Sequence, residues 1–315
     1  MVHSAPNSAD EFFLNLWAYT IGDYIQSMKI SFTSMCWVLS SILNSQHSYP
    51  PQLPNTERYT YKEGSGKKLQ LYVYKPADWS SEDSRPAIVF YFGGGWVGGS
   101  PSHFPSQAQH YADLGLVTVL ADYRVASRNQ TKAKHCVEDA RDAIRYVRTK
   151  AKKLGIDPNR IASSGGSAGG HLAACLGTIK DPLEEVSSVP NAMILFNPVC
   201  VLTPIDGVEL STWNLKRMQE RVGLPPEELS PAHYVKPGNP PCIIFHGSNN
   251  ETVTFATAEK FSQLMNEAGN ECTLHPFDGR DHGFFNRSRK ERGDQDYHQT
   301  LALADEFLRN LKWID

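Results

Sequence analysis

Short runs of almost wholly apolar residues alternate with helical patterns along most of this 315-residue chain. A strand that is apolar throughout is buried on both faces, and such strands belong to parallel sheets covered by helices. Two less apolar runs, ERYTYKE and KLQLYVYKP, precede them and resemble a hairpin. The alternation predicts an α/β fold, with one mostly parallel sheet of about eight strands flanked by helices. The apolar strands are expected to begin at Ala87, Leu116, Arg160, Ala192, Cys242 and Cys272.

The segments between these strands carry apolar residues at helical spacing. We expect helices over His135–Lys153, Gly169–Leu176, Ala256–Ala268 and Tyr297–Leu311. A shorter helical patch covers Asn214–Arg221.

One proline-rich interval, between AMILFNP and CIIFHG, interrupts the alternation. It is longer than an ordinary connection, and long loops in compact domains are usually lids or binding loops. We therefore expect a small lid insertion near residues 203–240. A surface excursion without a role is the alternative.

Charge and composition exclude several classes of protein. The chain has 31 Lys and Arg against 34 Asp and Glu, a net charge of −3, and no run of like charges. A nucleic-acid or polyanion partner is therefore disfavoured. No apolar run reaches the roughly 18 residues that span a bilayer, so no stable membrane span is expected. The composition leaves the oligomeric state undetermined.

The N-terminal 48 residues admit two interpretations. The run from Ile30 to Leu43 has no charge, and Met28 and a lysine stand directly before it. A secretory signal translated from Met28 has this form and predicts a secreted or periplasmic protein. Apolar residues also recur every fourth position from Phe13 to Ile25, which is typical of amphipathic helices that would cap a pocket in a cytoplasmic protein. Residues 1–48 are therefore either a signal-like or a cap segment.

A proline-rich stretch follows this segment. Residues 49–57 read YPPQLPNTE and show little periodicity, which is typical of a linker. Residues 58–315 then form the α/β domain, with the lid insertion inside it.

Five of the six cysteines lie in or beside these apolar stretches. They are widely spaced, with no CxxC pair and no Cys/His cluster of metal-ligand spacing. We expect buried free thiols at Cys136, Cys175, Cys200, Cys242 and Cys272.

The motif GGSAG at Gly165–Gly169 is the strongest functional signal. It follows the predicted strand RIASSG and precedes the apolar helical run HLAACLG. In a Gly-x-Ser-x-Gly turn between a strand and a helix, the serine projects above the sheet, and the helix N-terminus faces developing negative charge. This context predicts that Ser167 is a nucleophile rather than part of a structural glycine-rich turn.

Three consecutive glycines follow the strand AIVFYF, in the segment YFGGGWVGG. Glycines leave backbone N–H groups unobstructed, and such donors stabilise the oxyanion of an acyl-transfer intermediate. A phosphate-binding loop would need Lys and Ser or Thr after the glycines, and these are absent. We therefore expect an oxyanion hole rather than a phosphate cradle or a flexible surface loop.

The segment GRDHGFFN follows the last predicted strand, CTLHPF. A general base belongs after the last strand when the order along the chain is nucleophile, acid, base. His282 is therefore the predicted base. Among the other histidines, His110, His171 and His246 are expected to support the site or the core.

With these motifs, residues 55–313 resemble the α/β-hydrolase fold and, within it, the hormone-sensitive-lipase-like esterases and related acetylesterases. That family's oxyanion loop commonly reads His-Gly-Gly-Gly, and Phe92 takes the place of the histidine here. The resemblance implies Ser167 as nucleophile and His282 as base. It implies an oxyanion hole made by the amides of Gly94, Gly95 and Ala168.

The resemblance also implies an activity. It indicates a serine carboxylic-ester hydrolase that acts on short-chain, especially acetyl, esters through an acyl-enzyme. The substrate would be a small-molecule or carbohydrate ester, and no metal or organic cofactor is implied.

The third member of the triad departs from the family pattern. The family has an acid in a segment resembling HGxxDxxV, and this chain reads HGSNNETV, so the aligned acid slot holds Asn250. An amide can orient an imidazole but cannot offset the charge of an imidazolium. In the serine-protease example, an Asp-to-Asn exchange lowers kcat by about 10⁴. Possible surrogate acids are Glu251, in the same loop, and Asp206, in the loop after the preceding strand.

Two other functions stay open. Serine peptidases share this fold and nucleophile turn, although they generally carry a large N-terminal addition. A non-catalytic binding protein on a hydrolase scaffold is favoured by Asn250 and opposed by the retained Ser167 and His282.

Overall fold

The computed structural model describes residues 49–64, 67–183, 185–210, 212–287 and 294–315. The expected signal-like or cap segment at residues 1–48 lies outside the described residues. All the helices and strands described belong to the unit Gln52–Asp315. Among the described helices, none is both long and apolar enough to cross a bilayer.

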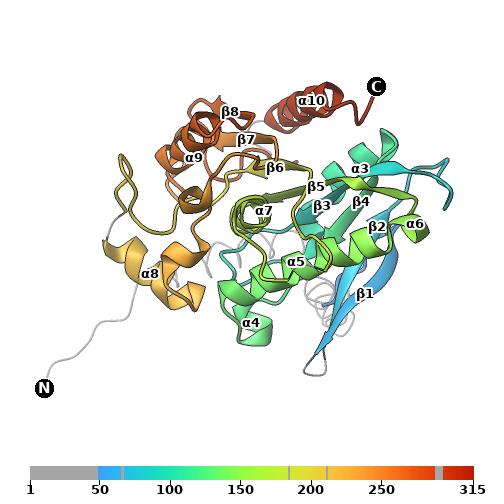
Figure 1. Cartoon of the computed structure of the whole chain (residues 1–315), viewed down its shortest axis with the longest axis horizontal. Helices are drawn as coiled ribbons and strands as arrows, with labels where there is room; N and C mark the ends of the chain where they lie inside the picture. The colour runs from blue at the N-terminus through green and yellow to red at the C-terminus, as the bar shows by residue number, and fades with distance from the viewer. Residues whose placement is uncertain (1–48, 65–66, 184, 211, 288–293) are drawn as a thin grey trace, which may run out of the picture. The chain divides into compact units, whose positions relative to one another are not determined.

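An eight-stranded sheet forms the centre of this unit (Figure 1). Its strand order is β1-β2-β4-β3-β5-β6-β7-β8, with β1–β2 and β2–β4 antiparallel and all other pairs parallel. This confirms the predicted mostly parallel α/β sheet and its hairpin. The strands are β1 (Glu57–Gly64), β2 (Lys67–Tyr74), β3 (Arg85–Tyr91), β4 (Val117–Ala121), β5 (Ile156–Gly166), β6 (Ala192–Phe196), β7 (Cys242–Gly247) and β8 (Cys272–Phe277).

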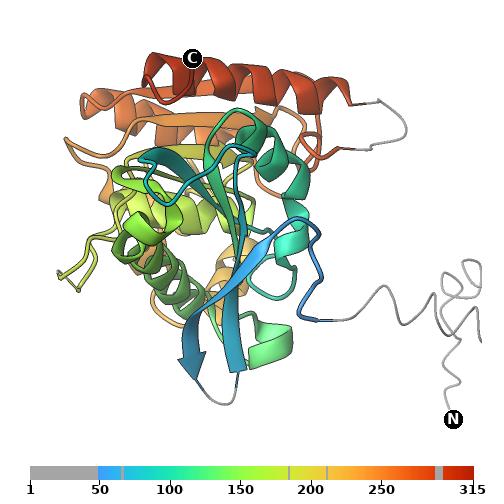
Figure 2. The ribbon, with the colours of Figure 1, turned by 90° about the vertical axis from the view of Figure 1, so that its right-hand side faces the viewer.

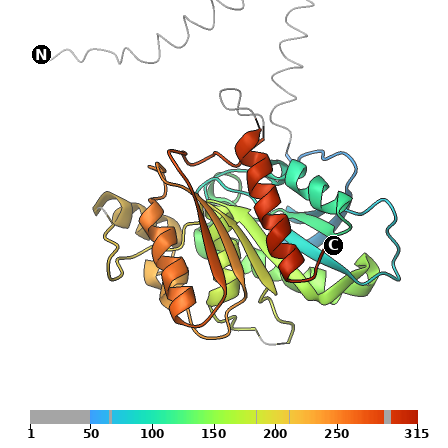
Figure 3. The same ribbon diagram turned by 90° about the horizontal axis from the view of Figure 1, so that it is seen from above.

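Helices cover both faces of the sheet, which explains why its central strands are apolar throughout. In β3, Val89 and Tyr91 face one core, and Ile88 and Phe90 face the other. Helices α5, α7 and α9 pack on the first core, and α3 and α10 on the second. Figure 3 shows α9 and α10 on opposite sides of the last strands. The helices are α3 (Pro105–Asp113), α4 (Ala126–Asn129), α5 (Ala133–Thr149), α6 (Ala151–Leu154), α7 (Ala168–Thr178), α9 (Phe255–Glu267) and α10 (Gln295–Asn310).

The hairpin β1–β2 and helix α10 lie at opposite ends of the sheet (Figure 2). The four longer helices expected from apolar spacing are present, although α6 continues the first of them after a break at Lys150. The helix α3 was not predicted. Its buried face includes the polar Gln107, so the sequence PSQAQHYAD does not show the regular spacing of apolar residues that predicts a helix.

The five cysteines predicted to be buried free thiols are buried and free. None of them lies in a surface position, so their sulfur atoms are part of the packed interior.

The interval between β6 and β7 contains the helix α8 (Thr212–Val222) and the 3-10 turns η2 (Pro226–Leu229) and η3 (Pro231–Tyr234). It spans the region 203–240 in which the lid insertion is expected. Several of its residues line the pocket that contains Ser167.

Strand register determines where the functional loops meet. Tyr91 pairs with Gly165, Phe196 pairs with Phe245, and Gly247 ends β7 opposite Phe277. The carboxyl ends of these parallel strands share one edge, where ligands bind in open α/β sheets. The glycine loop, the GGSAG turn and the loops after β6, β7 and β8 therefore meet there.

Candidate active site

Ser167 occupies a strained turn between β5 and α7. Its φ of 55° and ψ of −120° are unusual for a residue with a side chain. The turn is held by a hydrogen bond from Ser167 N to Phe196 O at 2.9 Å and by close packing of the helix on β3. A Cβ on Gly169 would lie only 2.0 Å from Tyr91 O. This geometry is the one that the motif predicts for an exposed serine nucleophile.

The glycine loop after β3 folds back on itself beside Ser167. Gly94 O accepts hydrogen bonds from Val97 N at 3.0 Å and Gly98 N at 3.1 Å, and Gly94 has a φ of 122°. Gly94 and Gly95 line the same pocket as Ser167. The amide of Ala168 is the first of α7, where N–H groups have no partner within the helix. The amides of Gly94, Gly95 and Ala168 thus come from the two turns that border the serine.

His103 binds the glycine loop from a different position than the histidine of the family motif. Phe92 stacks on Tyr123, with ring centroids 3.9 Å apart, and Tyr123 Oη donates to Phe92 O at 2.6 Å. His103 follows in η1 (Pro101–His103), and its Nδ1 accepts from Gly93 N at 3.2 Å. Burial lowers the pKa of His103, which favours the neutral ring that can accept this bond. His103 is not among the site residues predicted from the sequence, because its contact with Gly93 depends on how η1 folds back over the loop.

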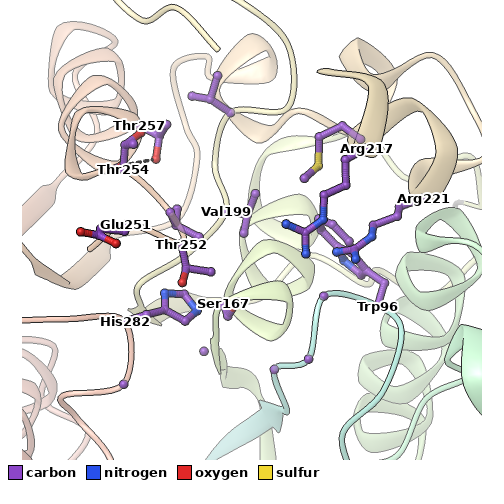
Figure 4. A pocket seen from close by; sticks show the side chains of 18 of the residues that line it. Trp96, Ser167, Val199, Arg217, Arg221, Glu251, Thr252, Thr254, Thr257 and His282 are labelled. Carbon is purple, nitrogen blue, oxygen red and sulfur yellow. Dashed lines mark hydrogen bonds between the residues drawn. The ribbon is translucent and has the colours of Figure 1, made fainter. Parts of the chain in front are cut away.

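His282 and Asn250 are joined by a hydrogen bond. His282 Nδ1 lies 3.1 Å from Asn250 Oδ1, and Figure 4 shows the His282 ring beside Ser167. Asn250 Oδ1 also accepts from Thr252 N at 3.1 Å and from Val253 N at 3.0 Å. Two backbone donors therefore identify Oδ1 as the atom that faces the ring. His282 Nδ1 must then carry its hydrogen, and Nε2 keeps its lone pair for a proton.

Asn197 fixes the other end of the Asn250 amide. Asn250 Nδ2 donates to Asn197 Oδ1 at 3.0 Å. Asn197 Oδ1 also accepts from Gly247 N at 3.1 Å, and Asn197 Nδ2 donates to His282 O at 2.9 Å. Asn197 thus ties the loop after β6 to the loops after β7 and β8. Asn197 is not among the predicted site residues, although a polar residue directly after the apolar run AMILF is a usable signal.

An amide in place of the triad acid can fail in two ways, by allowing the wrong histidine tautomer and by supplying no charge, and this network removes the first. In the serine-protease example, the Asp-to-Asn exchange leaves the histidine in the wrong tautomer. Here the donors around Asn250 Oδ1 and the acceptor at Asn197 keep the tautomer that a general base needs. The amide still supplies no charge to balance an imidazolium.

His246 packs behind Asn250. Its Nε2 lies 2.9 Å from Val253 O and 3.2 Å from Asn250 Nδ2. Burial lowers the pKa of His246 to about 4, so its ring is neutral at neutral pH. The neutral His246 ring therefore places no positive charge next to the Asn250 amide.

His171 and His110 have different surroundings. Trp96 Nε1 donates to His171 Nδ1 at 3.3 Å, and His171 Nε2 lies 2.7 Å from Leu229 O. His171 therefore connects the glycine loop to η2. His110 instead faces Asp305, with Nε2 2.9 Å from the carboxylate, in a different pocket.

The two candidate surrogate acids lie in different places. Glu251 is exposed on the pocket wall, and in Figure 4 its carboxylate points away from the His282 ring. Asp206 is exposed in the turn between Ile205 and Val208, and it is not among the described residues that line the pocket. The structure brings Asn250, and not Asp206, to the site.

The pocket around Ser167 has a volume of about 720 Å³. The glycine loop and His282 form one part of its wall, and the interval that contains α8 forms another (Figure 4). This second wall combines apolar side chains with two arginines. It comprises Val199, Val201, Leu210, Arg217, Met218 and Arg221.

The sequence is similar to a known family and to curated esterases. The sequence model of the BD-FAE family matches residues 71–265. The carboxylesterase NlhH of Mycobacterium tuberculosis is 38% identical over 127 residues, which cover 40% of this chain and 38% of that enzyme. The acetylxylan esterase of Xylanibacter ruminicola is 28% identical over 240 residues, 74% of this chain and 47% of that enzyme. The chain thus spans less than two thirds of the length of these curated relatives.

Solved structures of esterase 2 from the planctomycete Thermogutta terrifontis are more similar. The native form is 47% identical, with a TM-score of 0.79 over 85% of this chain and 96% of that chain. A propionate-bound form is 48% identical with a TM-score of 0.79, covering 85% and 98%. A form phosphonylated by sarin is 47% identical with a TM-score of 0.80, covering 85% and 99%.

Proposed function

The chain belongs to the BD-FAE family of α/β-hydrolase esterases, and from this premise we propose that it hydrolyses carboxylic esters through an acyl-enzyme on Ser167. The observation that carries the proposal is the strained Ser167 at the start of α7, in one pocket with His282 and the glycine loop. The esterase of T. terrifontis that is phosphonylated by sarin supports a nucleophilic mechanism.

The geometry suits a two-step reaction. His282 Nε2 takes the proton of Ser167 as its Oγ attacks the ester carbonyl, and His282 then gives that proton to the leaving alcohol. The amides of Gly94, Gly95 and Ala168 are placed to hold the oxyanion. Water, deprotonated by His282, next attacks the acyl carbonyl and releases the acid. The proton returns to Ser167 Oγ at the end of the cycle.

The proposed substrate is an ester with a short acyl group, such as an acetyl ester of a small molecule or a carbohydrate. Structures of the T. terrifontis esterase with propionate and with butyrate support short acyl groups. The similarity to an acetylxylan esterase supports acetyl esters of a sugar.

A non-catalytic binding protein is the second candidate, and Asn250 is the observation that favours it. Because Asn250 carries no charge, it supplies no counter-charge to an imidazolium formed at His282. The two candidates differ in one property, because only an activated Ser167 attacks an electrophile quickly.

Labelling with a fluorophosphonate tests both. Ser167 Oγ would form a bond to phosphorus with loss of fluoride, and mass spectrometry of the digest locates the adduct. We expect Ser167→Ala to lose both labelling and ester hydrolysis, and the control Thr254→Val, which removes another hydroxyl from the pocket wall, to keep both. If Ser167→Ala keeps more than a small fraction of the wild-type kcat, Ser167 is not the nucleophile.

We also propose that residues 58–315, with the lid at 203–240, carry the whole site. Residues 1–48 would then be a secretory signal if translation starts at Met28, which makes the protein secreted or periplasmic, or a cap in a cytoplasmic protein. A chain that begins at Ser48 and hydrolyses esters with unchanged acyl-chain preference favours the signal. Lower solubility and a changed preference favour the cap.

A further inference from the structure

Two arginines of α8 enter the pocket from the side opposite His282. Arg217 and Arg221 are four residues apart, so they lie on one face of the helix, and both line the pocket. Figure 4 shows their side chains extending from α8 toward the interior of the pocket, over Trp96. Like charges at this spacing destabilise a helix. The two arginines therefore place positive charge on the pocket wall, where an anionic group of a ligand can meet it.

Arg221 lies directly against the glycine loop. Its Nη1 is 3.0 Å from the position that a Cβ on Gly95 would occupy. Burial and, to a smaller extent, the charge of Arg217 lower the pKa of Arg221, and the neighbouring Glu220 opposes them. No ion pair among the described residues includes Arg221. The guanidinium is thus held close to the reaction centre in surroundings that disfavour its charge.

The C-terminus of α8 is stabilised without the Arg221 side chain. A cation near a helix C-terminus is favourable, but Lys132 Nζ already donates to Glu220 O at 2.6 Å. Val222, directly after Arg221, is fully buried and holds the last turn against the domain. Helix capping therefore does not explain why Arg221 lies on the pocket wall.

We propose that the esters hydrolysed by this protein carry a carboxylate, which Arg217 and Arg221 bind beside the oxyanion loop. The planar guanidinium groups match a carboxylate and can bind it through paired hydrogen bonds. The apolar remainder of the wall accommodates the uncharged part of the substrate. This proposal rests on the proposed ester hydrolysis and names its substrate class. The carboxylate can belong to the acyl group or to the alcohol, and the experiment separates the two.

The test uses two pairs of esters that differ in one charge. On the alcohol side, 4-acetoxybenzoate is compared with 4-acetoxybenzamide, and on the acyl side, the phenyl monoester of terephthalate with the phenyl ester of terephthalamic acid. We expect kcat/KM to be at least about tenfold higher for the carboxylate in one pair, because hydrogen bonds to charged groups contribute that much or more. The pair that shows the preference identifies the side.

Three variants assign the preference to the arginines. Arg221→Gln and Arg217→Gln are expected to raise KM for the preferred carboxylate ester about tenfold to a hundredfold and to change kcat/KM for its amide counterpart less than about threefold. Lys216→Gln removes the same charge from an exposed position on α8 and is expected to leave both unchanged. Equal rates on the charged and neutral esters, with no effect of the arginine variants, would overturn the proposal while ester hydrolysis stands.

A binding measurement decides the matter if none of the four esters is hydrolysed. That result contradicts ester hydrolysis of this type, but Ser167→Ala can still be titrated with 4-acetoxybenzoate and with 4-acetoxybenzamide by calorimetry. Tighter binding of the carboxylate that is lost in Ser167→Ala/Arg221→Gln supports the anion site. Equal binding of the two compounds overturns it.

Discussion

At position 250, an amide takes the place of a carboxylate, and its neighbours determine what it can do. Two backbone N–H groups and His282 Nδ1 surround Asn250 Oδ1, while Asn197 Oδ1 accepts from Asn250 Nδ2. The side chain therefore orients the ring in the way that general-base catalysis needs. Only the charge is missing, and the charge stabilises the imidazolium in the transition state.

We expect Asn250→Asp to raise kcat on an activated acetyl ester by tenfold or more. The carboxylate keeps the three bonds at Oδ1 and adds the charge. The contact with Asn197 Oδ1, 3.0 Å from the present amide nitrogen, offsets part of the gain, so the full factor of about 10⁴ from the serine-protease example is an upper bound. Steady-state kinetics over a range of substrate concentrations measures the change.

Three controls accompany this variant. Asn249→Ala alters the exposed neighbouring residue in the same loop and is expected to have no effect. Glu251→Gln and Asp206→Asn test the surrogate acids, and a large loss of kcat/KM in either identifies that residue as the working acid. An Asn250→Asp enzyme no faster than the wild type would show that the missing charge does not limit the reaction.

At the scale of elements, the site depends on how closely α7 approaches β3. Gly169 lies in the first turn of α7, where a Cβ would meet Tyr91 O at 2.0 Å and Phe92 O at 2.5 Å. Both atoms belong to the backbone and cannot move aside as a flexible side chain can. The same close approach sets the relative position of Ser167 and the glycine loop, so packing and catalysis share one constraint.

Gly169→Ala is therefore expected to lower the free energy of unfolding by about 3 kcal/mol, the upper end of the usual range for overpacking a tight interior. The matched control is Gly98→Ala in the glycine loop, where a Cβ would have no neighbour within 4 Å. Urea denaturation followed by circular dichroism compares the two. If Gly169→Ala and Gly98→Ala are equally stable, α7 can move away from β3 without a loss of stability.

At the scale of the whole molecule, two buried neutral histidines couple stability to acidity. Burial lowers the pKa of His171 and of His246 to about 4, from 6.5. Above pH 6.5 both rings are neutral in the folded and unfolded states, so they have no effect. Between pH 6.5 and 4 only the unfolded chain takes up their protons, and stability falls as the pH falls.

Each histidine is expected to cost about 2 kcal/mol of stability at pH 5 relative to pH 7. The amide of His171→Gln can replace the hydrogen bonds to Trp96 and Leu229. Between pH 7 and pH 5, this variant should lose about 2 kcal/mol less stability than the wild type. His298→Gln, at an exposed position, is the control and should follow the wild type. Urea titrations at pH 7 and pH 5 measure the difference, and identical losses in all three proteins would contradict the assignment.

Local patterns in the sequence determined the sheet, its flanking helices and the segments that carry the chemistry. Apolar runs with buried faces and glycines around a serine are short-range signals, because burial on both faces and a strained turn each restrict the residues that fit. The predicted Ser167, His282 and Asn250 fall in loops at one edge of the sheet for the same reason, since parallel strands bring their carboxyl ends together.

Tertiary structure decided which partners complete the site. His103 accepts a hydrogen bond from Gly93, Asn197 orients the Asn250 amide, and the arginines of α8 enter the pocket. Each of these contacts joins separate segments of the chain, and the pattern of strands does not predict them. Asn250 illustrates the division. Its position follows from the chain after β7, but which of its two side-chain atoms faces His282 depends on donors and acceptors from separate loops. The direction of these hydrogen bonds is fixed only when the loops meet at the edge of the sheet, so it cannot be predicted from any single segment of the sequence.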